Sequence, residues 1–197
     1  MPKHDQKLYF ISLIPPSPLR DEIQKLKYYV RDKYNSSRSL NAPPHITLLA
    51  PFKLSGAKEE LSDMLDRFSS KWRSFKISFN HFSVFSPRVI FIDVEKSKEL
   101  LQIQKHLENM ARSNPDIFSY NYDEREYHPH LTLAFRDLSK ADFYKAWDEF
   151  KHKKFEADFL TEKMSLLKHN GEQWKVVEEF DFSRIEFAEN PQNKGHH

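Results

Sequence analysis

The sequence predicts an α+β protein built from mostly antiparallel sheets in two interlocked lobes. Apolar stretches of strand length outnumber those with helical spacing. Several neighbouring strands are separated by hairpin-length connections, which join antiparallel rather than parallel strands. One short motif also occurs twice, about half a chain apart. This repetition suggests that two halves of the chain bring matching strands to one place.

The spacing of apolar residues predicts where the helices and strands lie. We expect helices from residue 19 to about 33 and over 57–70, 96–112 and 140–151, where apolar residues recur every three or four positions. Ser17 is the expected N-cap of the first helix, with Pro18 as its first helical residue. Asn170 and Gly171 predict a hairpin turn. Besides the two motif strands, we expect strands at 7–14, 75–79, 82–85, 89–94, 153–159, 163–168 and 174–182.

The expected order of elements is β α β α β β β α β α β β β, which favours an α+β fold over a doubly wound parallel sheet. We expect one two-lobed domain over residues 1–190 and a tail over 191–197. The lobes would divide near residue 95, with strand exchange between them possible.

Composition excludes several classes of protein. The chain has 197 residues, with 31 Lys and Arg against 29 Asp and Glu, so it lacks the strongly basic balance of a histone-like protein. It contains no Cys, which excludes a thiolate nucleophile and a thiolate zinc site. Three Gly are too few for a Gly-rich phosphate loop. We see no signal-peptide pattern or membrane-spanning run, and therefore expect a cytoplasmic protein, monomeric as the simplest case.

The repeated motif carries the chemistry of the chain. It occurs at residues 44–48 (PHITL) and 129–133 (PHLTL). Side chains alternate faces along a strand, so each copy presents a His and a Thr on one face and two apolar residues on the other. A Pro before each His is tolerated at the start of a strand. The side chains expected to face a common site are His45, Thr47, His130 and Thr132.

Two facing imidazoles can act as a general acid and a general base near neutral pH. A neutral ring would take a proton from the attacking hydroxyl, while a protonated ring gives one to the leaving oxygen. This division suits in-line attack at phosphorus. The Thr hydroxyls can bind phosphate oxygens. Lys53 and Arg136 follow the two motifs at similar distances and could offset negative charge, and Tyr127 precedes the second motif as a possible substrate contact. This scheme needs no metal or cofactor.

Other interpretations stay open. A duplicated fold explains the apolar positions of both motifs, but it does not explain a His and a Thr together on the opposite face. A zinc site made by His45, His128 and His130 would be a metal-dependent alternative, although Pro129 disturbs the strand between two of these residues. A third alternative is a module that binds RNA ends or nucleotides without catalysis.

The doubled His-x-Thr-x pattern resembles the two-histidine phosphoesterase superfamily, which includes 2′-5′ RNA ligase-like proteins and cyclic phosphodiesterases. The resemblance extends over most of the chain. It includes the first strand (LYFISLI), both motifs and the final hairpin (MSLLKHNGEQWKVVEEFDF). Many relatives carry an Arg directly after the second motif, whereas here Phe135 takes that place and Arg136 follows.

The resemblance implies two pseudo-symmetric lobes of mostly antiparallel sheet, with helices outside and an active-site cleft between the lobes. It implies a hydrolase that acts on ribose 2′ or 3′ phosphodiesters, such as a 2′,3′-cyclic phosphate or a 2′-5′ linkage. The expected partner is a nucleotide or an RNA end. His45 and His130 would be catalytic and Thr47 and Thr132 would bind the phosphate, with Lys53, Tyr127 and Arg136 as possible contacts.

Overall fold

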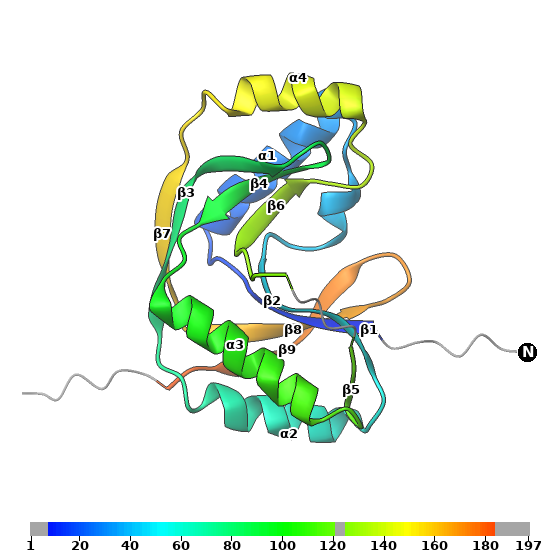
Figure 1. Ribbon diagram of the computed structural model, residues 1–197, viewed down its shortest axis with the longest axis vertical. Helices are drawn as coiled ribbons and strands as arrows, with labels where there is room; N and C mark the ends of the chain where they lie inside the picture. The colour runs from blue at the N-terminus through cyan, green and yellow to red at the C-terminus, as the bar shows by residue number, and fades with distance from the viewer. Residues whose placement is uncertain (1–7, 121–124, 184–197) are drawn as a thin grey trace, which may run out of the picture.

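A computed structural model describes residues 8–120 and 125–183. The two sheets lie between pairs of helices (Figure 1). The predicted α+β class with two lobes of antiparallel sheet is confirmed. The expected tail at 191–197 lies outside the described residues.

The first sheet has five strands. Its order is β5-β2-β1-β8-β9, and every pairing between neighbours is antiparallel. The bounds are Leu8–Leu13 for β1, Ile46–Leu54 for β2, Phe118–Ser119 for β5, Lys163–His169 for β8 and Trp174–Asp181 for β9. The predicted hairpin joins β8 to β9, and Gly171 takes a positive φ of 101° in its turn. Few residues other than Gly adopt this conformation without strain.

The second sheet has four strands in the order β6-β4-β3-β7, again antiparallel throughout. The bounds are Phe75–Phe85 for β3, Val89–Val94 for β4, His130–Ala134 for β6 and Glu156–Thr161 for β7. We expected separate strands at 75–79 and 82–85, and this prediction is wrong. A single strand continues through the region because His81 takes a positive φ of 63°, which accommodates a register shift without ending the strand.

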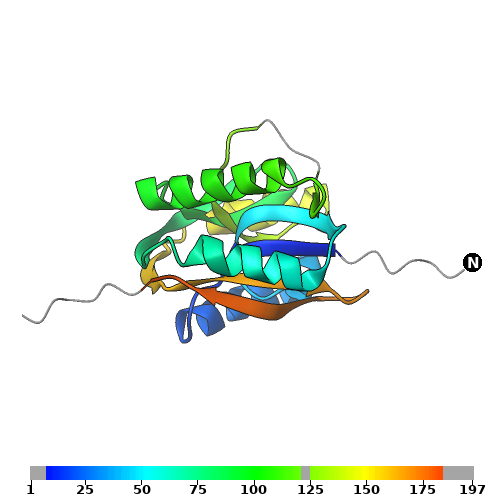
Figure 2. The same ribbon diagram turned by 90° about the horizontal axis from the view of Figure 1, so that it is seen from below.

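Four helices cover the outer faces of the sheets. They are α1 (Leu19–Tyr34), α2 (Lys58–Ser69), α3 (Lys98–Ser113) and α4 (Lys140–Phe150). α1 and α4 pack on the four-stranded sheet, while α2 and α3 lie side by side on the five-stranded sheet (Figures 1 and 2). Ser97 and Ser139 cap α3 and α4 by accepting hydrogen bonds from backbone amides.

The start of α1 differs from the prediction. Pro18 occupies the N-cap position, and the Ser17 hydroxyl accepts a hydrogen bond from the Arg20 guanidinium instead of capping the helix. The polar segment after α1 also contains a short 3₁₀ helix, η1 (Arg38–Asn41), which the sequence pattern did not predict.

The two motif strands adjoin each other at the junction of the lobes. β2 belongs to the five-stranded sheet and β6 to the four-stranded sheet, and the two strands are in contact. Each sheet contains strands from both sides of residue 95. One apolar core extends through both lobes and includes Ile46, Leu48, Leu131 and Leu133. The buried faces of both motif strands are therefore anchored in the same core.

Candidate active site

The first motif fixes the orientation of one imidazole. His45 lies directly before β2, and Ile46 and Leu48 behind it are buried. Nδ1 of His45 lies 2.7 Å from the carbonyl oxygen of Pro43. A carbonyl can only accept, so Nδ1 carries the hydrogen and Nε2 of the neutral ring is the free proton acceptor. The ring also packs on Phe10, with centroids 4.9 Å apart.

The second motif repeats this geometry. Nδ1 of His130 donates to the carbonyl oxygen of His128 at 2.7 Å, again two residues earlier in the chain. Its ring packs against Phe85 and Phe91, with centroid distances of 5.0 and 5.1 Å. Both imidazoles thus have the same tautomer, with Nε2 unprotonated in the neutral ring, and both are held by an aromatic neighbour.

A direct hydrogen bond joins the two motifs. The Tyr127 hydroxyl, three residues before His130, donates to the backbone carbonyl of Thr47 at 2.7 Å. Burial raises the pKa of Tyr127, so its hydroxyl keeps its proton and stays a donor. The bond holds the segment that leads into the second motif against the strand of the first motif.

The environment keeps both imidazoles neutral at neutral pH. Burial lowers the pKa of His45 to about 4; the Pro43 carbonyl opposes this shift, and positive charge on Lys27 and on His130 adds to it. The effect of His130 shows that the two rings are within electrostatic reach of each other. Burial also lowers the pKa of His130, while the nearby Asp93 carboxylate acts in the opposite direction.

Hydroxyl groups lie beside both histidines. Thr47 is half-buried and pairs with Ser12 across β1 and β2, and Thr132 is half-buried and pairs with Phe91 of β4. Paired residues of antiparallel strands share one face of the sheet. Ser12 is fully buried, and its hydroxyl has no hydrogen-bond partner among the described residues. Thr47 and Ser12 therefore place two hydroxyls on the same face.

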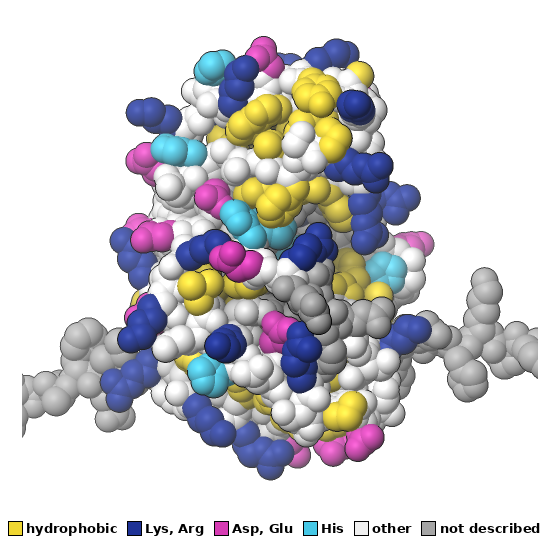
Figure 3. Space-filling model, in the orientation of Figure 1, with side chains coloured by type: hydrophobic (Ala, Val, Ile, Leu, Met, Phe, Trp, Pro, Cys, Tyr) yellow, Lys and Arg dark blue, Asp and Glu magenta, His cyan; other side chains and the backbone are white. Residues whose placement is uncertain are grey.

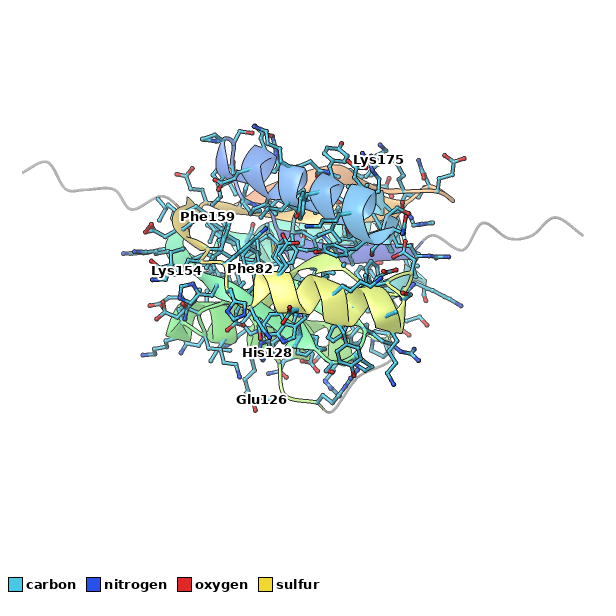
Figure 4. All side chains as sticks on the ribbon, turned by 90° about the horizontal axis from the view of Figure 1, so that it is seen from above. Phe82, Glu126, His128, Lys154, Phe159 and Lys175 are labelled. Atoms are coloured by element: carbon cyan, nitrogen blue, oxygen red, sulfur yellow. The ribbon has the colours of Figure 1, made fainter. Side chains whose placement is uncertain are left out.

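A second histidine supports His130. Nε2 of His128 lies 3.0 Å from a carboxylate oxygen of Asp93, which pairs with His130 across β4 and β6. Figure 4 shows His128 near the body of the protein and Glu126 further out on the loop that leads to β6. This contact anchors the residue whose carbonyl orients the second imidazole.

Aromatic side chains extend from the first imidazole towards the β8–β9 hairpin. Phe10 contacts both His45 and Trp174, with a centroid distance of 4.7 Å to the indole. Trp174 in turn contacts His169 at 4.9 Å. Trp174 is partly exposed. Figure 3 shows histidines beside hydrophobic side chains in the middle of one face, with Lys and Arg around them.

The other predicted site residues, Tyr127, Lys53 and Arg136, lie in different parts of the structure. Tyr127 contacts the first motif through the bond to Thr47. Lys53 lies near the other end of β2, paired with Leu8 and Ser119. At roughly 3.3 Å per residue, the strand carries it about 25 Å from His45. Arg136 follows β6, is exposed, and holds its guanidinium over the neighbouring Phe135 ring. The two motif strands that carry the His and Thr residues are in contact, whereas Lys53 lies far along β2.

Sequence reasoning missed three residues at this site: Lys27, Asp93 and Trp174. Lys27 is 1% exposed and its Nζ donates to the Ala42 carbonyl at 2.7 Å. The helical spacing places Lys27 on the buried face of α1, so the sequence contains a signal for this residue. Asp93 follows the apolar run of β4 directly, and Trp174 directly precedes the alternating strand of the last hairpin.

No group of three His, Asp or Glu side chains suited to a metal ion occurs within residues 8–120 and 125–183. Two pockets of about 670 and 630 Å³ lie away from both motifs. One is lined by residues of the segment 71–78 and the start of α3, and the other by α2 and α3. Neither pocket contains a motif residue, so the matched imidazoles define the candidate site.

Comparison with known proteins identifies the family of the chain. The model of the 2′-5′ RNA ligase superfamily matches residues 15–173. The chain belongs to this superfamily. A protein of Bacillus mycoides (strain KBAB4) named "Putative phosphoesterase" is 28% identical over 181 residues, which cover 88% of this chain and 96% of the relative. A protein of the same name from Geobacillus thermodenitrificans is 29% identical over 177 residues, covering 87% and 94%.

Two solved structures have a similar fold. The protein TT0787 of Thermus thermophilus superposes with a TM-score of 0.58 at 21% identity, covering 89% of this chain and 97% of the other. E. coli LigT complexed with 3′-AMP gives a TM-score of 0.57 at 18% identity, covering 90% and 98%. In the part of the chain that the structure describes, no helix has the length and apolar character needed to cross a membrane.

Proposed function

We propose that the protein is a metal-independent phosphoesterase that acts on a ribose 2′ or 3′ phosphodiester, with His45 and His130 as its acid–base pair. The observation that carries the proposal is the matched geometry of the two imidazoles. Each is fixed by an Nδ1 hydrogen bond to the carbonyl two residues earlier, and each leaves Nε2 as the proton-transferring atom. The membership of a phosphoesterase superfamily supports the same chemistry.

In the proposed hydrolysis, one neutral imidazole removes a proton from water as the water oxygen attacks phosphorus. The other imidazole, protonated, donates its proton to the leaving ribose oxygen as the P–O bond breaks. The product is a phosphomonoester, and one proton has passed to the enzyme and one from it. Thr47 and Thr132 bind the non-bridging oxygens.

We assign the base to His45 and the acid to His130. His45 faces positive charge on Lys27, which disfavours its protonated form. His130 faces the Asp93 carboxylate, which favours the protonated form. In the reverse reaction, the two residues exchange roles.

A nucleoside-containing substrate fits the surroundings of this pair. Crystal structures of E. coli LigT hold 3′-AMP, NADP+, ATP or phosphate. In this chain, Trp174 lies partly exposed at the end of an aromatic row that begins at His45. A partly exposed indole, separated from His45 by the Phe10 ring, can stack on a base, as aromatic side chains do in many RNA-binding sites. We therefore propose 2′,3′-cyclic nucleotides, 2′-5′ dinucleotides or RNA ends as substrates.

A turnover screen tests the proposal. Wild type, His45→Ala and His130→Ala are assayed on 2′,3′-cyclic nucleotides, 2′-5′ dinucleotides and RNA with a cyclic phosphate end, with and without EDTA. Each variant should lose about 10²- to 10⁴-fold in kcat, the usual size of a general acid–base contribution, and EDTA should have no effect. His152→Ala is the matched control, because His152 is exposed after α4.

Three outcomes would contradict the proposal. Near-wild-type turnover by either motif variant would remove the assigned residue from the chemistry. Loss of activity in EDTA would indicate a metal-dependent hydrolase. Tight binding of these substrates by wild type, without turnover of any, would indicate a nucleotide-binding or RNA-end-binding module.

A further inference from the structure

A lysine is buried in the apolar stripe of α1. The buried residues of this helix are Ile23, Lys27, Val30 and Tyr34, which recur at the spacing of one helix face. Lys27 is 1% exposed. Burial of an amine away from water is costly unless a partner compensates it, so a Lys at this position requires an explanation.

The only hydrogen-bond acceptor of Lys27 among the described residues is a backbone group next to the active site. Its Nζ donates to the carbonyl of Ala42 at 2.7 Å. The carbonyl of the next residue, Pro43, accepts the hydrogen bond from Nδ1 of His45. One buried amine and one imidazole thus bind consecutive carbonyls of the same short segment, and Lys27 is within electrostatic reach of the imidazole.

Carboxylates on the elements packed against α1 are engaged elsewhere. Glu149 of α4 accepts hydrogen bonds from Tyr29, Tyr34 and Lys33. Asp137, just beyond β6, accepts from the backbone and side chains of residues 36–38.

Asp142 and Asp148 of α4 pair with Lys145 and Lys151. The ionisable groups of β6, of η1 and of the residue before β2 are basic. His130 lies on β6, His45 lies before β2, and Arg38 of η1 is exposed. No described carboxylate forms an ion pair with Lys27, so its charge is available to act on His45.

We propose that Lys27 is a positioning residue of the histidine site: its amine fixes the segment that orients His45 and keeps His45 as the proton acceptor of the pair. The inference deepens the proposed function and rests on it. A positive charge beside the imidazole opposes protonation of that ring, so His45 stays unprotonated when the substrate arrives. Burial lowers the pKa of Lys27 to about 7, so this influence weakens as the pH rises through neutrality.

Two variants separate the two roles of Lys27, which are the hydrogen bond to the segment before His45 and the positive charge near the His45 ring. Lys27→Met removes both the donor and the charge while keeping an unbranched apolar chain. We expect its kcat to fall about tenfold or more, with KM within about twofold, because small misplacements of a catalytic group cost rate. The acid limb of its kcat/KM profile should move to higher pH, since His45 becomes easier to protonate.

Lys27→Gln keeps a donor without charge. It should recover part of the lost kcat but show the same shift of the acid limb. Lys25→Met is the control, because Lys25 is exposed on the same helix. A folded Lys27→Met enzyme with wild-type kcat and an unmoved acid limb would overturn the inference.

An NMR titration of the wild-type imidazoles needs neither a variant nor activity. His45 should titrate well below its ordinary value, with a small second inflection near pH 7 as Lys27 loses its proton. A single His45 transition near the ordinary value of about 6.5 would overturn the inference even if both variants failed to fold. The titration also separates failure of this inference from failure of the proposed function, because it does not use a substrate.

Discussion

The hydrogen bond between the two motifs allows a quantitative test. Tyr127→Phe removes only the hydroxyl that donates to the Thr47 carbonyl. Loss of a buried hydrogen bond, with its acceptor left in place, costs about 1–2 kcal/mol in the free energy of unfolding. For a domain of this size, each kcal/mol corresponds to about 2–4 °C in Tm, so Tm should fall by about 2–8 °C.

The same change should affect catalysis. The bond holds the segment before β6 against the backbone of Thr47. Its loss should make the distance between the two imidazoles more variable. We expect kcat to fall about tenfold, with little change in KM, because misplacement of acid and base acts on the transition state. Urea denaturation and steady-state kinetics measure the two effects separately.

Tyr144→Phe is the control for this test. Tyr144 lies on α4 and is 52% exposed, so removal of its hydroxyl should leave both quantities unchanged. If Tyr127→Phe matched wild type in stability and in kcat, the bond would not couple the motifs. If stability fell but kcat did not, the bond would be structural only.

Two further predictions concern pH and base recognition. The kcat/KM profile for a 2′,3′-cyclic nucleotide should be bell-shaped and should rise as His45 deprotonates near pH 4. It should fall as His130 loses its proton below the ordinary value of about 6.5, so an alkaline optimum would exclude the assigned roles. Trp174→Ala should raise KM for cyclic nucleotides about tenfold, the worth of one stacked base, but leave glycerol 1,2-cyclic phosphate unaffected; equal effects on both substrates would exclude base stacking.

The local parts of the fold were predictable from the sequence. Both motif strands, the Asn170–Gly171 hairpin and the apolar stripes of the helices depend on short-range periodicity, and the structure contains them. The division of strands between the sheets was not predictable in this way. β7 pairs with β3 and β8 pairs with β1, and these partners are far apart in the chain. Local patterns do not determine such pairings.

The differences at the site have specific physical causes. Lys27 was not singled out because a charged residue normally lies in solvent, yet it lies four positions after Ile23 and three before Val30 on the buried face. The similar spacing of Lys53 and Arg136 from their motif histidines does not predict a shared position, because an extended strand carries Lys53 away from His45. The predicted break between residues 79 and 82 is absent because His81 takes a left-handed conformation inside a continuous strand, which is uncommon for a residue other than Gly.

The central claim is that the two imidazoles act as one unit, and a double-mutant comparison tests it most directly. The kcat values of His45→Ala, His130→Ala and the double variant are measured on one 2′,3′-cyclic nucleotide. Residues that act in the same step are strongly non-additive, so the double variant should be at most a few-fold slower than the slower single variant. A loss in the double variant equal to the product of the two single losses, or wild-type turnover in either single variant, would contradict the account.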